Sequence, residues 1–345
     1  MEITLKYTNL LYSVEIKEKR RIMTNTKRIL CLTHEQDVDG LFSGAILKNA
    51  FPDTLVFLTN YGQKNMERAA NIIKSNVARS SKNGTIVITD LGIDDAEDIK
   101  PIEDAAIDAR NYGWDFIWLD HHVWSEEIKR RAQSFASLIL SKDEMKCTAE
   151  LVYERFAKNR RTCERIAKFA HNVDFRLPAV HKLPPLPELI SYYRSLINPY
   201  PKLQSIVNKA SKGVFWDDEF QEDFEYQYLP VRESAISSAM KSLTIYNIHN
   251  HKVAITESPR IISKSILSEK IFLEKPEVSL VILFAPDGKV SIRRKPGSDI
   301  KCDVIGRRLD GGGHSYAAAG IIKNNSESLK KGQVAQALET ILKEI

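Results

Sequence analysis

Acidic and histidine side chains follow three apolar, strand-like segments of the sequence, each directly where a segment ends. His34, Asp37 and Asp39 follow Ile29–Thr33; Asp90 follows Thr85–Thr89; Asp120, His121 and His122 follow Phe116–Leu119. Ligands in open α/β sheets bind beyond the carboxyl ends of the strands, so we expect these side chains to share one crevice. Asp174, at the end of a helical stretch, is a further candidate.

The negative charges of several carboxylates in one dry pocket must be neutralised. Two unit charges about 4 Å apart repel by roughly 4 kcal/mol at an effective dielectric constant near 20. Protons or divalent cations must therefore neutralise them. Carboxylate and imidazole ligands without thiolate suit manganese, magnesium or iron better than structural zinc. Two such ions sharing a bridging carboxylate clamp a phosphate and activate water, so the pattern predicts phosphoester hydrolysis.

Each part of this pattern also has a simpler interpretation. Asp37-Val38-Asp39-Gly40 is by itself typical of a turn or helix cap, and Asp90 alone could cap the next helix. A lone His34 is more often a core or surface histidine. Two adjacent histidines at a strand end are uncommon, however, and all the candidates occur in order at strand ends. The combination therefore favours a metal centre.

A second group of residues lies near the C-terminus. Gly311, Gly312 and Gly313 precede His314, and Arg293 and Arg294 end an earlier predicted strand. Glycines let backbone N–H groups approach an anion without Cβ obstruction, and arginine pairs with phosphate through a planar fork. A bare triple glycine is equally typical of a flexible loop, but the adjacent histidine and arginines favour ligand binding.

The elements around these residues predict an α/β fold. Strand-length runs, with Thr54–Thr59 as the fourth, alternate with segments of helical period at Leu41–Ala50, Met66–Ala78 and Asp94–Tyr112. This alternation is typical of a parallel sheet covered by helices on both faces. Helices are also expected at Thr148–Lys158 and Cys163–Val173.

A cluster of prolines, Pro178, Pro184, Pro185 and Pro187, marks a boundary. We expect an N-terminal extension at residues 1–26, a catalytic domain at 27–187, a helical linker at 188–245 and a smaller mixed α/β domain at 246–345. The last should contain a hairpin around Pro286-Asp287-Gly288 and a glycine loop before a strand at Ala318–Ile322.

The composition sets outer limits on function. The chain has 345 residues, of which 43% are hydrophobic and 28% charged, and its net charge is +5. This balance allows nucleic acid as a partner without requiring it. No apolar run approaches the roughly 20 residues of a membrane helix, and the N-terminus lacks a signal-peptide core, so we expect a cytoplasmic protein with no membrane partner. The four cysteines form no C-x-x-C pair and are expected to be buried.

The sequence resembles the DHH phosphoesterase superfamily, with an N-terminal DHH domain and a C-terminal DHH-associated domain, over roughly residues 27–345. The resemblance is carried by the motifs His34, Asp37-Val38-Asp39-Gly40, Thr89-Asp90, Asp120-His121-His122 and Gly311-Gly312-Gly313-His314. That superfamily includes RecJ-type exonucleases, nano-RNases that also act on pAp, cyclic-dinucleotide phosphodiesterases and manganese-dependent pyrophosphatases. Archaeal relatives that work beside replication or repair helicases are similar in build.

The resemblance implies roles for individual residues. One manganese ion would be held by His34, Asp37 and Asp90; the other by Asp39, Asp90, His121 and Asp174, with Asp90 bridging. His122 would face the phosphate, and Arg293, Arg294 and Gly311 to His314 would bind the far phosphate or terminal nucleotide. Two positions depart from the usual pattern: His34 is three residues before Asp37 instead of four, and Asp174 lies in a weak motif.

The expected function is a hydrolase with two divalent ions, Mn²⁺ first and Mg²⁺ second, which cleaves single-stranded DNA, RNA or short oligonucleotides from an end. A modest basic excess suits a short or single strand better than extended duplex. A replication or repair helicase is a candidate partner. The alternatives are a small-nucleotide phosphoesterase acting on pAp or a cyclic dinucleotide, and a non-catalytic replication or repair scaffold; a pyrophosphatase is less favoured. Scaffold relatives characteristically lose metal ligands, and this chain keeps every candidate.

Overall fold

The computed structural model describes residues 28–80, 83–93, 95–175, 177, 182–323 and 328–343. The expected N-terminal extension, residues 1–26, lies outside these ranges. The chain forms two compact units: residues up to Pro187 together with Tyr200–Phe215, and residues Glu188–Pro199 together with Trp216 onwards. Among the described residues, no helix combines the length and the apolar character that a membrane span requires.

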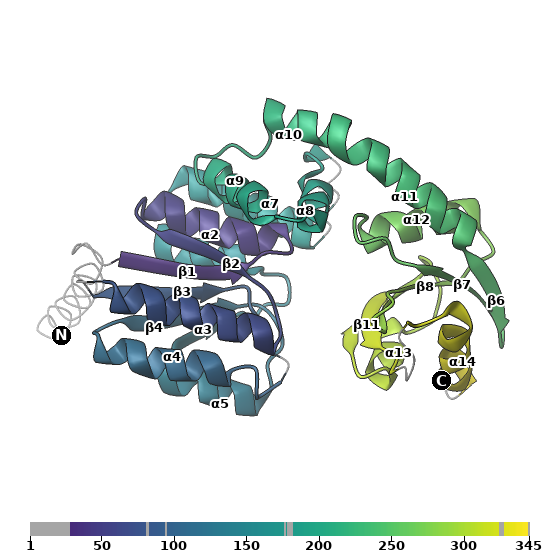
Figure 1. Cartoon of the computed structure of the whole chain (residues 1–345), viewed down its shortest axis with the longest axis horizontal. Coiled ribbons are helices and arrows are strands. Elements are labelled where there is room, and N and C mark those ends of the chain that lie inside the picture. Colours follow the sequence, from purple (N-terminus) through teal and green to yellow (C-terminus); the bar gives the residue numbers. More distant parts are fainter. Residues whose placement is uncertain are drawn as a thin grey trace, which may run out of the picture. The chain divides into compact units, whose positions relative to one another are not determined.

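The first unit is built on a five-stranded parallel sheet (Figure 1). Its strands are β1 (Arg28–His34), β2 (Leu55–Thr59), β3 (Gly84–Thr89), β4 (Asp115–Asp120) and β5 (Ser137–Leu140), in the order β2-β1-β3-β4-β5. The chain leaves β1 toward β2 on one side and continues with β3 on the other. The carboxyl ends of β1 and β3 therefore flank the point where the strand order reverses, which is the usual ligand position in such sheets.

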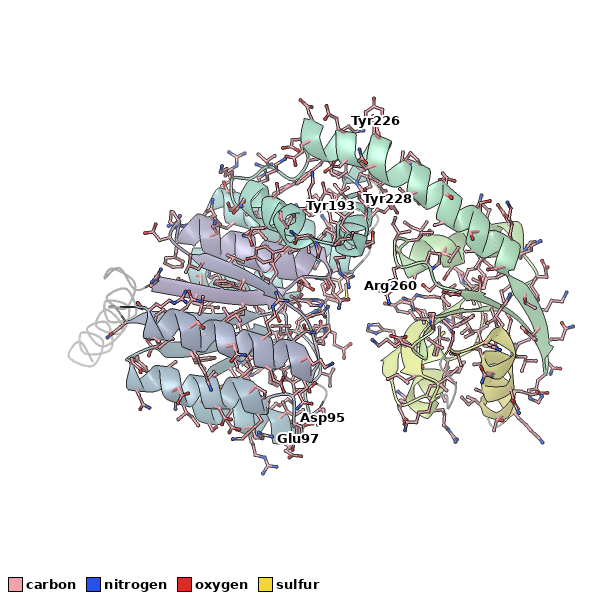
Figure 2. All side chains as sticks on the ribbon, in the orientation of Figure 1. Asp95, Glu97, Tyr193, Tyr226, Tyr228 and Arg260 are labelled. Atoms are coloured by element: carbon pink, nitrogen blue, oxygen red, sulfur yellow. The ribbon has the colours of Figure 1, made fainter. Side chains whose placement is uncertain are left out.

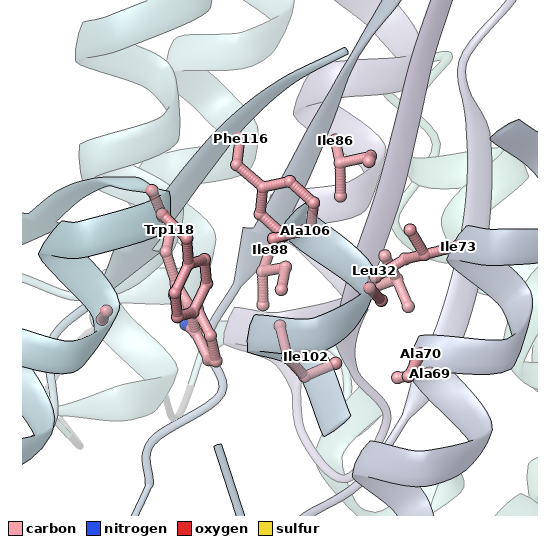
Figure 3. Packing of buried hydrophobic residues seen from close by; sticks show 14 of the residues in the cluster. Leu32, Ala69, Ala70, Ile73, Ile86, Ile88, Ile102, Ala106, Phe116 and Trp118 are labelled. Carbon is pink, nitrogen blue, oxygen red and sulfur yellow. The ribbon is translucent and has the colours of Figure 1, made fainter. Parts of the chain in front are cut away.

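One face of the sheet packs on α3 (Gln63–Ala78), α4 (Lys100–Asn111) and α5 (Glu126–Phe135). Figure 3 shows this core: Ile86 and Ile88, two positions apart on β3, belong to the same apolar cluster as Ile73 of α3 and Ile102 of α4. Every second residue of a strand faces the same side, so these positions form one apolar layer.

The other face packs on α2 (Val38–Ala50), which is itself enclosed by α6 (Thr148–Val152), α7 (Arg161–Asp174) and α9 (Tyr200–Ala210). α6 continues directly into the π-helical segment η1 (Tyr153–Ala157). Eleven of the thirteen residues of α2 are buried, as expected for a helix that is apolar on all sides. The aromatic rings of Phe42, Phe169 and Phe215 pack together in this layer.

The second unit contains a six-stranded mixed sheet in the order β10-β11-β9-β8-β7-β6. Its strands are β6 (Thr244–Ile248), β7 (His251–Glu257), β8 (Leu280–Phe284), β9 (Lys289–Arg294), β10 (Gly312–His314) and β11 (Ala317–Ile321). Among these described strands only β7 and β8 pair in parallel, with α12 (Lys264–Glu274) connecting them. α11 (Leu229–Ser242) and α12 pack on one face, and α13 (Cys302–Arg308) and α14 (Lys331–Lys343) on the other.

Helices precede this sheet in the second unit. They are α8 (Leu186–Ser195) and the consecutive segments α10 (Asp218–Glu222), η3 (Asp223–Tyr228) and α11. Figure 2 shows Tyr193 of α8 and Tyr228 of η3 in the same region. The Tyr228 hydroxyl donates a hydrogen bond to Glu188 (3.1 Å), and Arg232 forms an ion pair with the same carboxylate (3.0 Å). These two contacts attach α8 to η3 and α11.

The predicted fold class is confirmed, with local corrections. α5, β5 and β6 were not predicted, because α5 and β5 are short and most residues of β5 and β6 are only half-buried. The helix expected over Asp94–Tyr112 begins at Lys100; turns occupy the described residues 95–99, and Pro101 stands in the first turn. The expected glycine loop is in fact the short strand β10, paired with β11. The four cysteines are buried and free, as predicted.

Candidate metal centre

The turn between β1 and α2 places three of the predicted ligands. His34 ends β1, and the Asp37 side chain caps α2 by accepting a hydrogen bond from the Gly40 amide (3.1 Å). Asp39 is in the first turn of α2 and is buried. A Cβ atom on Gly40 would lie 2.3 Å from the His34 carbonyl oxygen, so only glycine allows the helix to start this close to the strand.

Asp90 follows β3 directly and has a left-handed backbone conformation, with φ of 57°. Its amide donates a hydrogen bond to the Leu119 carbonyl oxygen (3.0 Å), which continues the pairing of β3 with β4 just past the end of β3. Aspartate tolerates this region better than most residues, and such conformations concentrate at functional sites.

The first candidate group consists of His34, Asp37 and Asp90. The Nδ1 atom of His34 lies 3.2 Å from Asp37 Oδ2 and 3.6 Å from Asp90 Oδ2. His34 Nε2 is buried and has no hydrogen-bond partner among the described residues.

The second candidate group consists of Asp39, His121 and Asp174. His121 Nε2 lies 3.8 Å from Asp39 Oδ2, and His121 Nδ1 lies 3.8 Å from Asp174 Oδ2. Asp90 Oδ1 is 3.6 Å from His121 Nε2. The two oxygens of Asp90 therefore approach the two groups separately, one each.

The donor atoms fit divalent ions. Ligands about 2.1 Å from a shared ion lie roughly 3 to 4 Å apart, depending on the angle between them. The separations of 3.2 to 3.8 Å from His34 Nδ1 and His121 Nε2 fall in that range. One ligand atom each of Asp39, His121 and Asp174 lies within 4.8 Å of the other two. Carboxylate oxygens with imidazole nitrogens, and no thiolate, form a donor set for magnesium, manganese or iron. The structure thus brings together all six residues predicted as metal ligands.

Crowded negative charge perturbs the acid–base behaviour of the site. Burial, and then the charge of Asp90, raises the pKa of Asp39 to about 8. Burial and nearby aspartates also raise the pKa of Asp90 and of Asp174. Burial alone would lower the pKa of His34, but Asp37 and Asp90 outweigh it and raise the value to about 10. Asp39, Asp90 and Asp174 therefore resist ionisation, and a bound cation would remove that resistance. At Asp37, by contrast, burial is outweighed by the charge of His34, which lowers the pKa.

His122 is held by the aspartate of its own motif. Its Nδ1 lies 2.8 Å from Asp120 Oδ1, and the other oxygen of this fully buried carboxylate accepts a hydrogen bond from Trp124 Nε1 (2.6 Å). Burial lowers the pKa of His122, but the hydrogen bond and charge of Asp120 raise it overall, to about 9. His122 also lies close to Asp90 and His121, so a cationic imidazole stands beside the two groups.

Tyr61 belongs to the site but was not predicted from the sequence. Its hydroxyl lies 3.3 Å from His34 Nδ1 and 3.4 Å from His122 Nε2, so it connects the first group to His122. Burial, followed by the surrounding aspartates, raises its pKa, which keeps the phenol protonated. Tyr61 comes two residues after the end of β2, so the strand-end rule that identified the other residues also applies to it.

The predicted substrate-binding residues of the C-terminal half lie together in the second unit. Arg293 on β9 pairs with Ala317 of β11, and His314 on β10 pairs with the same residue. The His314 ring stacks on Tyr316, with 5.3 Å between centroids and 3° between planes. The Arg293 side chain donates a hydrogen bond to the Ile292 carbonyl oxygen (2.9 Å).

The glycines of this motif have a packing reason of their own. A Cβ atom on Gly311 would lie 2.2 Å from the Ala319 carbonyl oxygen, and Gly313 has φ of 139°. Of the three, Gly312 alone has open space around an added Cβ. Arg294 donates a hydrogen bond to the Ile300 carbonyl oxygen (3.2 Å), which ties the end of β9 to the approach to α13.

Comparison with solved structures supports the fold assignment. RecJ from Thermus thermophilus, in complex with Mn²⁺, gives a TM-score of 0.59 at 15% identity, over 95% of this chain and 54% of RecJ. The pGpG-specific phosphodiesterase PggH from Vibrio cholerae gives a TM-score of 0.53 at 13% identity, over 92% of this chain and 99% of PggH. CDC45 from Entamoeba histolytica gives a TM-score of 0.51 at 9% identity, over 96% of this chain and 98% of CDC45. At these identities the likeness concerns the fold alone. No curated protein sequence matches the chain.

A family model adds sequence evidence. The model of the DHH family, N-terminal domain, matches residues 28–173, a range that contains β1 to β5 and all the candidate ligands except Asp174. Members of this family are metal-dependent phosphoesterases. The resemblance deduced from the sequence motifs is thereby confirmed for residues 28–173, which match the N-terminal domain of the DHH family.

Proposed function

We propose that the protein is a phosphodiesterase that uses two divalent ions, Mn²⁺ in preference to Mg²⁺, to hydrolyse single-stranded DNA, RNA or short oligonucleotides from an end. The observation that carries this proposal is the position of Asp90, whose two oxygens approach His34 and His121 separately. That arrangement suits a carboxylate shared by two ions. The RecJ structure in complex with Mn²⁺ supports a divalent metal ion at this site.

Each side chain has a proposed role. His34, Asp37 and Asp90 hold one ion, and Asp39, Asp90, His121 and Asp174 hold the other. The ions, when bound, polarise the phosphoryl oxygens and lower the pKa of a coordinated water. His122, kept cationic by Asp120, donates a hydrogen bond to a phosphoryl oxygen where negative charge develops. Tyr61 orients His122 through its hydroxyl.

The residues of the second unit have a proposed role in binding. Arg293, Arg294 and His314 with its three preceding glycines hold the far phosphate or the terminal nucleotide. Arg293 and His314 are both paired with Ala317, so they lie in one row across the sheet with β11 between them, which supports a common site. A replication or repair helicase is the proposed partner, which the fold shared with RecJ and CDC45 supports.

A small-nucleotide phosphoesterase is the second candidate. PggH, described as specific for pGpG, matches this chain over nearly the full length of both proteins, whereas the chain covers only about half of RecJ. A chain of this length thus suffices for action on a dinucleotide in that protein.

One experiment separates these functions. The full chain is incubated with Mn²⁺ and 5′- or 3′-labelled single strands, duplexes, dinucleotides, pAp and pyrophosphate. We expect stepwise shortening of single strands, and a preference for dinucleotide or pAp would favour the second candidate. Asp90→Asn should abolish hydrolysis, whereas Asp143→Asn, which changes an exposed aspartate outside both groups, should not. A wild-type chain that binds Mn²⁺ but cleaves nothing in this panel would indicate a scaffold.

A further inference from the structure

The start of α6 contacts the second candidate group through its backbone. The amide of Thr148 donates a hydrogen bond to Asp39 Oδ2 (2.8 Å), and the amide of Ala149 donates one to Asp39 Oδ1 (2.7 Å). All three residues are buried. Each carboxylate oxygen keeps a further lone pair, so Asp39 can accept these bonds and still bind a cation.

The Thr148 side chain reaches a second ligand. Its hydroxyl donates a hydrogen bond to Asp90 Oδ1 (3.1 Å). This is the oxygen of Asp90 that approaches His121, not the one that approaches His34. One residue therefore holds two carboxylates that come from different elements, α2 and the end of β3.

The start of α6 is in turn attached to α7. Glu150 accepts hydrogen bonds from the Cys147 amide (3.0 Å) and from His171 Nδ1 (2.8 Å). His171 lies on α7 three residues before Asp174, which belongs to the second group. Hydrogen bonds therefore join Asp39 and Asp90 to the start of α6, and join α6 to α7, the helix that ends at Asp174.

We propose that Thr148 is a positioning residue for the second metal site, and that the Glu150–His171 pair holds it in place. This inference rests on the proposed two-metal function. Asp39 and Asp90 repel each other, since the charge of Asp90 makes Asp39 harder to ionise in this buried site. The donors at the start of α6 offset part of that repulsion before a cation arrives. Within the described residues, no hydrogen bond joins α6 to His34, Asp37 or Asp90 Oδ2, so the effect belongs to the second site.

The test compares two substitutions at Thr148 in the full chain. Thr148→Val keeps the shape of the side chain and removes the hydroxyl, and Thr148→Ser keeps the hydroxyl. Mn²⁺ alone is titrated into metal-free protein by calorimetry and electron paramagnetic resonance. We expect two binding sites in the wild type, about 10- to 100-fold weaker affinity at one of them in Thr148→Val, and affinity within about threefold of wild type at both in Thr148→Ser.

The outcomes distinguish this inference from the proposed function. Two sites in the wild type and unchanged affinities in Thr148→Val would overturn the role of Thr148 alone. Failure of the wild type to bind Mn²⁺ would overturn the two-metal function itself. Equal weakening of both sites would also contradict the inference, because the hydroxyl contacts only the oxygen on the His121 side.

A second variant covers the case in which Thr148→Val does not fold. Glu150→Gln can still accept from the Cys147 amide but loses the charged partner of His171, and both Glu150 and His171 are partly exposed. We expect a several-fold loss of Mn²⁺ affinity at the same single site, with an unchanged melting temperature of the metal-free protein to within a few degrees. Wild-type affinity at both sites in Glu150→Gln would refute the proposed attachment through α7.

Discussion

Asp120, like His122 of the same Asp-His-His motif, lies outside both groups of candidate ligands. Its carboxylate is fully buried and is shared between His122 and the indole N–H of Trp124. The residues of the motif therefore have different roles: His121 lies beside the other ligands of the second group, and Asp120 favours the protonated form of His122.

Asp120→Asn should lower the pKa of His122 toward its ordinary value, because the substitution removes the negative charge that raises it. Nuclear magnetic resonance titration of the imidazole should show a clear decrease. Hydrolysis should fall more at about pH 8 than at about pH 6, where the imidazole of the variant is still largely protonated. Trp124→Phe, which keeps the carboxylate, should change the titration much less, and an unshifted His122 in Asp120→Asn would contradict this assignment.

The raised pKa values of the aspartates predict how stability depends on pH. A carboxyl group whose folded pKa exceeds its unfolded value contributes stability that is complete below the unfolded pKa, about 3.8, and is lost as the pH rises through the folded pKa. For Asp39 that folded value is about 8. The metal-free wild type should therefore lose stability relative to Asp39→Asn between about pH 4 and pH 8, measured by thermal unfolding.

Bound Mn²⁺ should counteract the loss of stability that the metal-free protein shows as the pH rises. Because Mn²⁺ binds the ionised carboxylates, its stabilising effect should grow over the same pH range and binding should release protons. Calorimetry in buffers of different ionisation enthalpy measures that release. A metal effect that does not vary with pH would show that the aspartates are already ionised without metal.

At the scale of elements, the junction of β1 and α2 is the part that tolerates least change. Gly40→Ala should force His34 and Asp39 apart, because the added Cβ would meet the His34 carbonyl carbon and oxygen at 2.8 and 2.3 Å. We expect a loss of about 1–3 kcal/mol of stability together with weaker Mn²⁺ binding.

The matched control is Gly332→Ala in α14, where an added Cβ meets nothing within 4 Å. It should leave Mn²⁺ binding unchanged and raise stability slightly, since alanine is the better helix former. Denaturant unfolding and metal titration of both variants measure the difference. Wild-type metal binding in Gly40→Ala would show that the junction is not needed to align the ligands.

At the scale of the whole molecule, the candidate ligands and the proposed substrate-binding residues belong to different compact units. His314→Ala should therefore leave Mn²⁺ affinity unchanged and raise KM for an oligonucleotide with little change in kcat, because it removes an exposed ring and no metal ligand. Steady-state kinetics with a short single strand test this. A fall in kcat without a change in KM would place His314 in a different role.

Much of the candidate site was predictable because its residues follow strands that are easy to recognise. β1, β3 and β4 are short apolar runs that end at acidic or histidine residues in the sequence. Parallel strands present their carboxyl ends at one edge of the sheet. His34, Asp37, Asp39, Asp90 and His121 could therefore be grouped without coordinates. The alternation of strands and helices also determined the fold class, since each period selects its own secondary structure.

Other features depended on contacts between distant segments. Thr148 is 109 residues from Asp39 and 58 from Asp90, and no local pattern marks it as their hydrogen-bond partner. The assignment of each oxygen of Asp90 to its own group, the sharing of Asp120 by His122 and Trp124, and the place of Tyr61 likewise follow from packing. Sequence periodicity determines which face of an element is buried, whereas side-chain partners across a core are chosen only when the whole set of elements packs together.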